Sequence, residues 1–236
     1  MRDFWNTDQI MLGAATNLLK RLGCLAALLA LLAASGSAAQ PVVGRDYQLI
    51  NPPRATDSGL KIEVLEFFWY GCIHCYRLEP SLNAWLKRKS ADVEFRYVPA
   101  VFDSSWLPLT RTFYALDAMG VVDTYHESIF HAIHRDGQRA LVIDPRAMAD
   151  WLGGKGIDKQ KYLDTYNSFA VTGRTQRAAD VTNRYGVSGT PALVVDGRYL
   201  TGPSMTLNPD NSIDYERFFQ VLDQLIAQAR KEHSGK

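Results

Sequence analysis

Two cysteines, Cys72 and Cys75, stand three residues apart with Ile73 and His74 between them. This spacing lets the two thiols close a small disulfide ring, and the thiolate is the species that attacks in thiol–disulfide exchange. A helix that begins at Cys72 would stabilise its thiolate through free backbone N–H groups and the helix dipole. His74 would add a hydrogen-bond donor or a positive charge near that sulfur. The pattern predicts a redox-active disulfide with Cys72 as the attacking thiol.

A zinc half-site is the main alternative for the same pair. Structural zinc usually needs two such cysteine pairs, or one pair and two histidines. The one other cysteine, Cys24, lies in the N-terminal leader, and we expect His126, His131 and His134 in a helical segment away from the pair. A purely structural disulfide is a weak alternative, because so short a loop hardly constrains the unfolded chain. We therefore expect no metal.

Glu66 is a lone carboxylate in the apolar run VLEFFWY, six residues before Cys72. A buried carboxylate has a raised pKa and can move protons near neutral pH. We expect Glu66 to exchange a proton with the buried thiol of Cys75. The alternative is a position at a sheet edge, facing solvent.

A proline opens a strand-like segment far downstream, in Gly189-Thr190-Pro191 before residues 192–195. Proline is tolerated at a strand start. A cis peptide bond there would expose the backbone of Thr190 for pairing with an extended peptide, so Thr190 and Pro191 are candidate substrate-binding residues. An ordinary trans proline is the alternative.

Aromatic residues around the cysteines admit two interpretations. Phe68, Trp69, Tyr70 and Trp106 could line a peptide groove, but aromatic residues this close to a core strand usually belong to the core. Arg96, on the next strand-like segment, is interpreted as a solvated charge.

The elements that must position these residues follow from periodicity and turn signals. Residues 61–70 are apolar on both faces, as in a strand covered on both sides. A helix to residue 89 and a strand at 93–98 follow. Helical patterns then occupy the chain up to residue 185, two of them capped by Asp144-Pro145 and by Asp158, and the last expected over 175–185. Two short strands joined by Asp196-Gly197 and an amphipathic helix from 215 complete the chain. This order predicts an α/β fold with a central mixed sheet, split by an all-helical insertion.

Residues 1–39 have the pattern of a cleavable signal peptide. Lys20 and Arg21 precede a short apolar run and a small-residue segment that ends at Ala39. Cleavage after Ala39 fits this pattern, and translation could begin at Met1 or at Met11. An uncleaved anchor is the alternative, although the apolar run is shorter than the ~20 residues that span a bilayer.

Composition and charge exclude several classes of protein. The 236 residues are 47% hydrophobic and 22% charged, as in an ordinary globular protein. Removing residues 1–39 takes three of the 26 basic and two of the 25 acidic residues, which leaves 23 of each sign. Without a basic excess or a polybasic block, nothing points to nucleic acid or to a membrane surface.

The segment LEFFWYGCIHCYRLEP, followed far downstream by GVSGTPALVVDGRYLTG, resembles the DsbA family of thiol:disulfide interchange proteins. The resemblance covers residues 45–231. It implies a thioredoxin fold with a helical insertion, a location in the bacterial periplasm, and donation of disulfides to newly exported proteins. It also implies a division into a signal peptide at 1–39, a thioredoxin-like domain at 40–101 and 175–236, and a helical insertion domain at 102–174.

The resemblance assigns a role to each matching residue. These are the nucleophile Cys72, the buried resolving Cys75, the redox-tuning His74, the buried acid Glu66 and the cis-proline Pro191. Two residues depart from the family pattern, because Ile73 stands where proline is common and Thr190 where valine is common. Both positions face the active sulfur, so redox strength and partner choice are open.

The resemblance implies no cofactor, reduced unfolded secreted proteins as substrates, and a monomer reoxidised by a DsbB-like quinone-linked membrane protein. Two other functions fit the same residues. One is a disulfide reductase or isomerase of the same fold. The other is a peptide-binding holdase that uses the groove beside Pro191 without redox turnover. Replacing Cys72 separates these functions, because a holdase would keep working without it.

Overall fold

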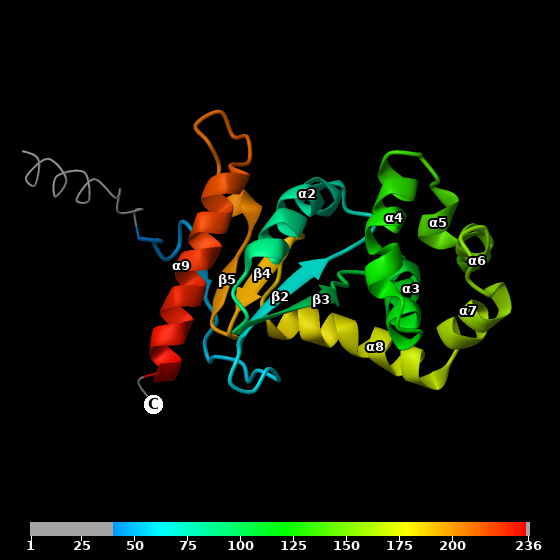
Figure 1. The fold of residues 1–236 in the computed structure, drawn as a ribbon, viewed down its shortest axis with the longest axis horizontal. Coiled ribbons are helices and arrows are strands. Elements are labelled where there is room, and N and C mark those ends of the chain that lie inside the picture. Colours follow the sequence, from blue (N-terminus) through cyan, green and yellow to red (C-terminus); the bar gives the residue numbers. More distant parts are fainter. Residues whose placement is uncertain (1–39, 235–236) are drawn as a thin grey trace, which may run out of the picture. The chain divides into compact units, whose positions relative to one another are not determined.

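The computed structural model describes residues 40–234, so the signal peptide expected at 1–39 lies outside the described residues. Within this range, five strands form one mixed sheet in the order β1-β5-β4-β2-β3 (Figure 1). The strands are β1 (Gln48–Leu49), β2 (Ile62–Phe68), β3 (Val93–Pro99), β4 (Ala192–Val195) and β5 (Tyr199–Thr201). β2 pairs in parallel with β3 and antiparallel with β4, as expected for a strand inside the sheet.

The apolar run at residues 61–70 forms β2, and all seven residues of this strand are buried. Successive side chains of a strand point to opposite faces, so one strand supplies two cores. Ile62 and Val64 pack into the core on one face, and Leu65 and Phe67 into the core on the other. The prediction of a strand covered on both faces is confirmed.

Three long helices cover the two faces of this sheet (Figure 1). They are α2 (Ile73–Arg88), α8 (Phe169–Arg184) and α9 (Tyr215–Ser234). Apolar residues of α2 and α9, including Leu82 and Leu222, pack on the face of Val64. The C-terminal half of α8 packs on the opposite face, where Val181 and Tyr185 approach Phe67.

The predicted helical insertion is confirmed as a run of helices between β3 and β4. Its helices before α8 are α3 (Leu107–Ala118), α4 (Val122–His134), α5 (Ala140–Ile143), α6 (Pro145–Gly153) and α7 (Lys159–Tyr166). The predicted caps are present: the Asp144 side chain accepts a hydrogen bond from the Arg146 N–H, and Asp158 accepts one from the Lys161 N–H. Both interactions satisfy donors that the first helical turn leaves free.

Three details differ from the sequence-based expectation. α8 begins at Phe169 instead of residue 175, because the Ser168 hydroxyl caps it by accepting a hydrogen bond from the Val171 N–H. The segment before residue 61, for which no strand is predicted, contains β1, which pairs antiparallel with β5. α5 is a four-residue helix that no periodic pattern marked.

The predicted hairpin is confirmed, with positive φ angles of 52° at Asp196 and 62° at Gly197 between β4 and β5.

Candidate active site

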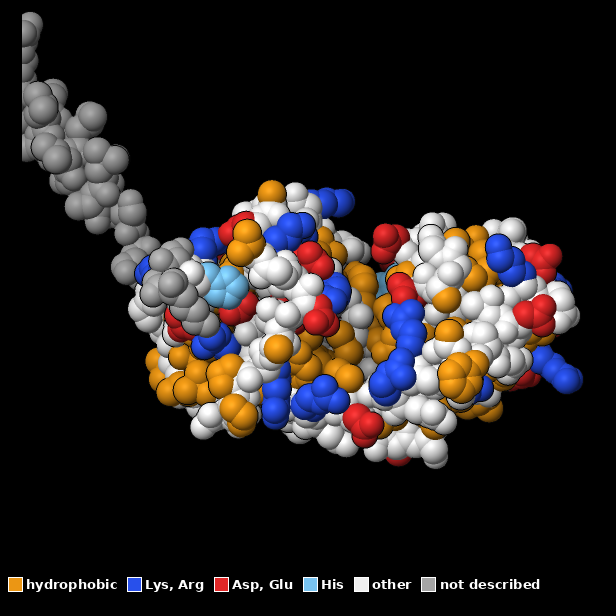
Figure 2. Space-filling view, turned by 90° about the horizontal axis from the view of Figure 1, so that it is seen from below, with side chains coloured by type: hydrophobic (Ala, Val, Ile, Leu, Met, Phe, Trp, Pro, Cys, Tyr) orange, Lys and Arg blue, Asp and Glu red, His pale blue; other side chains and the backbone are white. Residues whose placement is uncertain are grey.

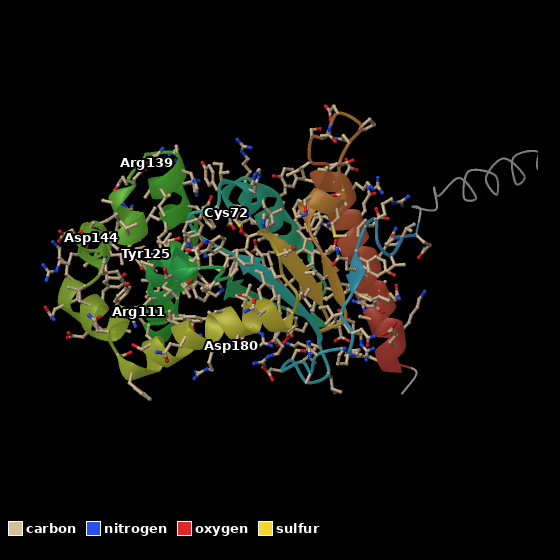
Figure 3. All side chains as sticks on the ribbon, turned by 180° about the vertical axis from the view of Figure 1, so that it is seen from behind. Cys72, Arg111, Tyr125, Arg139, Asp144 and Asp180 are labelled. Atoms are coloured by element: carbon tan, nitrogen blue, oxygen red, sulfur yellow. The ribbon has the colours of Figure 1, made fainter. Side chains whose placement is uncertain are left out.

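Cys72 stands at the N-terminus of α2, where a tight turn after β2 delivers it (Figure 3). Its backbone N–H donates to the carbonyl of Trp69 at 2.9 Å, and the helix begins at the next residue. Gly71 leaves room for the Trp69 ring in this turn, because a Cβ at this position would lie 2.4 Å from the ring. The first helical turn carries no acidic side chain, so its free N–H groups remain available to an anion at Cys72.

The surroundings of Cys72 lower its thiol pKa to about 5. The largest cause is a hydrogen bond from the Cys75 thiol. Burial of the sulfur acts in the opposite direction and raises the pKa. Further hydrogen bonds to the thiolate, from the Thr190 side chain and from the backbone N–H groups of Cys75 and His74, lower it. The Cys72 sulfur also lies 3.4 Å from the Thr190 carbonyl oxygen, to which the neutral thiol can donate. Cys72 is therefore a thiolate at neutral pH.

Cys75 has the opposite character, although it lies one helical turn away. It is fully buried in the core that the insertion builds around Phe68 and Phe130. Burial is the main cause that raises the pKa of its thiol, and the hydrogen bond and charge of Cys72 and the charge of Glu66 act in the same direction. In the described state both cysteines are free thiols. The more exposed Cys72 is therefore the reactive thiolate, and Cys75 stays protonated.

Glu66 is fully buried, which excludes the solvent-facing alternative. Neither of its carboxylate oxygens has a hydrogen-bond partner among the described residues. Burial raises its pKa well above the ordinary range, and the charges of Glu79 and Cys72 raise it further. Both effects favour the protonated carboxyl group, the form that can donate a proton to a nearby thiolate.

A second buried acid, Glu79, is not predicted from the sequence, and His126, expected away from the cysteines, is buried beside it. The His126 Nε2 atom lies 3.5 Å from the Glu79 Oε1 atom, and its Nδ1 atom lies 2.9 Å from the Tyr70 hydroxyl. The charge of Glu79 is among those that raise the pKa of Glu66, so this cluster is electrostatically linked to the cysteines. Glu79 follows Cys75 by one helical turn, and that spacing was the signal available.

The histidines of the insertion lie closer to the cysteines than expected. The His134 Nε2 atom lies 2.8 Å from the carbonyl oxygen of Tyr70, two residues before Cys72. Together with the His126 contact, this corrects the expectation that these side chains sit away from the pair, because α4 packs directly against the turn that follows β2. No group of three or more His, Cys, Asp or Glu side chains within residues 40–234 is arranged to hold a metal ion.

A groove of about 510 Å³ runs beside the cysteines, and we call it the Pro191 groove. The Thr190–Pro191 peptide bond is cis, so the trans alternative is excluded. The groove is mainly apolar and combines residues of the proline loop with residues after β5. It is lined by Gln48, His74, Val187, Ser188, Gly189, Thr190, Pro191, Ala192, Leu200, Thr201, Gly202, Pro203, Ser204, Met205, Leu207, Asn211 and Ile213.

His74 reaches the site in two ways. Its backbone N–H is one of the donors to the Cys72 thiolate, and its exposed side chain lines the Pro191 groove. The structure thus brings together Cys72, Cys75, His74, Thr190 and Pro191, with Glu66 buried behind the pair.

The aromatic residues divide between core and rim. Phe68 and Tyr70 are buried in the core of the insertion, as the core interpretation predicts. Trp69 is half-buried and stacks on Trp106, with ring centroids 4.3 Å apart, and Phe102 meets the Trp106 ring edge-on at 4.8 Å. This stack supports the turn that carries Cys72.

Comparisons with known proteins agree with this geometry. The family model of the DSBA-like thioredoxin domain matches residues 104–209. The thiol:disulfide interchange protein DsbA of Burkholderia cepacia is 39% identical over 216 residues, which cover 91% of this chain and 96% of the relative. DsbA of Pseudomonas aeruginosa is 40% identical over 203 residues, which cover 82% and 95%.

Solved structures show the same fold. The crystal structure of Pseudomonas aeruginosa DsbA superposes with a TM-score of 0.74 at 36% identity, covering 82% of this chain and 97% of that one. The structure of reduced DsbA1 from Neisseria meningitidis superposes with a TM-score of 0.70 at 29% identity, covering 84% and 100%. With the dithiol at the start of α2 and the proline loop beside it, these matches show that the chain belongs to the DsbA family of thiol:disulfide interchange proteins.

Proposed function

We propose that the oxidised protein donates its Cys72–Cys75 disulfide to reduced, unfolded proteins in the periplasm. The observation that carries this proposal is the opposite shift of the two thiol pKa values, lowered to about 5 at Cys72 and raised at Cys75. A stabilised Cys72 thiolate favours the reduced form of the enzyme, which makes its disulfide an oxidant.

The first step is attack by a substrate thiolate on the Cys72 sulfur. A substrate–Cys72 disulfide forms, the Cys72–Cys75 bond breaks, and the Cys75 sulfur leaves with the electron pair. Because Cys75 is buried and its pKa is raised, this thiolate takes up a proton. Protonated Glu66 supplies the proton, since its own raised pKa keeps it neutral until a thiolate forms beside it.

In the second step, another thiolate of the substrate attacks the substrate sulfur of the mixed disulfide. The substrate disulfide forms, and Cys72 leaves as the stabilised thiolate. The substrate dithiol has lost two electrons and the enzyme disulfide has gained them. A low pKa makes Cys72 a good leaving group, so this step favours release over reversal.

The Pro191 groove supports binding of the substrate polypeptide. It opens beside Cys72, its lining is mostly apolar, and residues such as Met205 offer adaptable contacts. Thr190 contacts the Cys72 sulfur and lines the groove as well, so peptide bound there lies next to the reacting atom. An unfolded chain exposes the apolar side chains and free backbone that such a groove binds.

Export and recycling complete the proposal. Residues 1–39 direct the chain to the periplasm and are removed after Ala39. There the protein acts as a monomer, and a DsbB-like quinone-linked membrane protein re-forms the disulfide by accepting the two electrons.

The test is transfer of the disulfide to a reduced, unfolded protein containing two cysteines. We expect oxidised wild type to transfer it stoichiometrically and Cys72→Ala to transfer none. Cys75→Ala, first activated as a disulfide between Cys72 and thionitrobenzoate, should form a mixed disulfide with the substrate through Cys72 and release thionitrobenzoate. If Cys72→Ala still protects the unfolded protein from aggregation as well as wild type, while wild type transfers no disulfide, the protein is a holdase instead.

A further inference from the structure

A second groove, of about 590 Å³, opens between α8 and the outer strand β3, and we call it the arginine groove. Four of its lining residues are arginines, and three of these belong to α8. It is lined by Ala55, Asp57, Glu63, Leu65, Arg96, Tyr97, Val98, Tyr114, Arg174, Arg177, Ala178, Val181, Arg184 and Tyr185. None of these residues lines the Pro191 groove. In Figure 2, which views the side of α8 from below, Lys and Arg side chains border an apolar surface.

Two of the arginines already have partners. Arg96 is ion-paired with the buried Glu63, and Arg174 is ion-paired with Asp117 at 2.6 Å and lies over the Tyr114 ring. Arg177 and Arg184 differ from them: both are exposed, and neither is ion-paired with an acidic side chain of residues 40–234. They lie two helical turns apart on α8, so they present two cationic groups along the groove without an anion.

The acidic side chains nearby do not neutralise this pair of cations. Glu63 is engaged by Arg96, and it also accepts a hydrogen bond from the backbone N–H of Asp57. Asp57 lines the groove, but no ion pair joins it to Arg177 or Arg184. Asp180 lies between these arginines on α8 without lining the groove (Figure 3). The groove thus has an excess of positive charge beside its apolar floor.

The floor and the wall of the groove fit a polypeptide better than a small anion. Leu65, Val98 and Val181 supply apolar contact area. β3 is the last strand of the sheet and pairs only with β2 among the described strands, so its other side offers unpaired backbone groups. An extended segment laid against such an edge gains main-chain hydrogen bonds, and its alternate side chains point to opposite faces.

We propose that the arginine groove docks an acidic, extended segment of another polypeptide along β3. Carboxylates on one face of the segment pair with Arg177 and Arg184, and apolar side chains between them pack on Val98 and Val181. This docking uses neither cysteine and does not depend on the disulfide-donor function. It gives the protein a second contact surface that selects partners by charge.

The probe is a short synthetic peptide with blocked ends in which Glu alternates with Val, and its counterpart has Lys in place of Glu. We expect amide NMR signals of β3 and α8 to shift with the acidic peptide, leaving those around Pro191 unchanged. The Lys peptide should not shift them. Binding should weaken as NaCl is raised, because salt screens exposed charge pairs.

The matched variants are Arg177→Glu with Arg184→Glu, and Arg139→Glu with Arg146→Glu as a control. All four arginines are exposed. The control pair lies at α5 and α6 of the insertion, where Figure 3 labels Arg139, and it makes the same change in net charge. We expect affinity for the acidic peptide to fall about tenfold or more in the first variant only. The proposal is wrong if the acidic peptide does not bind, or if it binds no better than the Lys peptide. It is also wrong if both variants lose the same affinity, or if the amide NMR signals shift only around the Pro191 groove. Disulfide transfer to a small dithiol is unaffected in either variant.

Discussion

Thr190→Val removes one hydrogen-bond donor from the Cys72 thiolate while keeping the size of the side chain. The Thr190 side chain is among the groups that lower the Cys72 pKa to about 5. A hydrogen bond to a charged group is worth about 1.5 kcal/mol at the low end of its range, which is appropriate for a half-exposed sulfur screened by solvent. One pKa unit corresponds to about 1.4 kcal/mol. We therefore expect the Cys72 pKa to rise by about 1 unit.

The redox consequence follows from thiolate stabilisation in the reduced state. A Cys72 pKa near 6 is still below neutral pH, so Cys72 of the reduced variant remains a thiolate. The full free energy of the pKa shift therefore destabilises the reduced form. Losing about 1.4 kcal/mol lowers the reduction potential of this two-electron couple by about 30 mV. The variant is thus a weaker oxidant than wild type.

Two assays check this prediction independently. Ultraviolet thiolate absorbance against pH gives the Cys72 pKa, and equilibration with glutathione buffers gives the potential. Thr165→Val is the control, because Thr165 is half-buried on α7, away from the cysteines in sequence, and its hydroxyl donates to the Lys161 carbonyl. An unchanged Cys72 pKa in Thr190→Val, or a changed potential with an unchanged pKa, would refute the assigned role of this hydroxyl.

Glu66→Gln should slow disulfide transfer at neutral pH by up to about 100-fold, measured by stopped-flow, because the proton donor to Cys75 is lost. The same variant should flatten the dependence of melting temperature on pH. The raised pKa of Glu66 means that the folded state holds its proton more tightly than the unfolded chain, so wild-type stability falls as pH rises above about 4. The wild-type reduction potential should fall by about 60 mV per pH unit below the Cys72 pKa and by about 30 mV above it, because reduction then takes up one proton instead of two. N-terminal sequencing of the exported protein should begin at Gln40, and a mature chain that starts at Met1 or Met11 would contradict cleavage.

Local signals were sufficient for most of the fold. Asp144 and Asp158 cap their helices because a short acidic side chain can reach the first free N–H groups, whatever the tertiary structure is. The start of α8 was missed because Phe169 continues the apolar spacing of Tyr162 and Tyr166, although it is almost fully exposed and belongs to the next helix. β1 has two residues and exists through its pairing with β5, which no local pattern encodes. The division at residues 102 and 175 stays a prediction, and α8 is continuous across the second of these positions.

The candidate site was predictable where its chemistry is encoded in neighbouring residues. The spacing of Cys72 and Cys75 and the apolar run around Glu66 mark all three residues in the sequence itself. Glu79 and His126 were not predictable in the same way. In sequence, Glu79 looks like a polar position on a helix surface and His126 like one of several helical histidines. Only the packing of α4 against α2 buries them side by side.

The inserted helices therefore contribute to the chemistry as well as covering the sheet. Cys72 and Cys75 share one helix, so their different pKa values must come from what surrounds each sulfur. The Cys75 thiol, Thr190 and backbone N–H groups donate hydrogen bonds to Cys72, whereas the insertion packs over Cys75 with residues such as Phe130. Burial is also the first cause of the raised pKa of Glu66. A sheet and α2 alone would leave both groups nearer to water, where their pKa values would return toward ordinary ones. The hydrogen bonds from the Cys75 thiol, from Thr190 and from the N–H groups at the start of α2 thus stabilise the reactive thiolate, and the insertion supplies the buried environment that keeps Cys75 protonated.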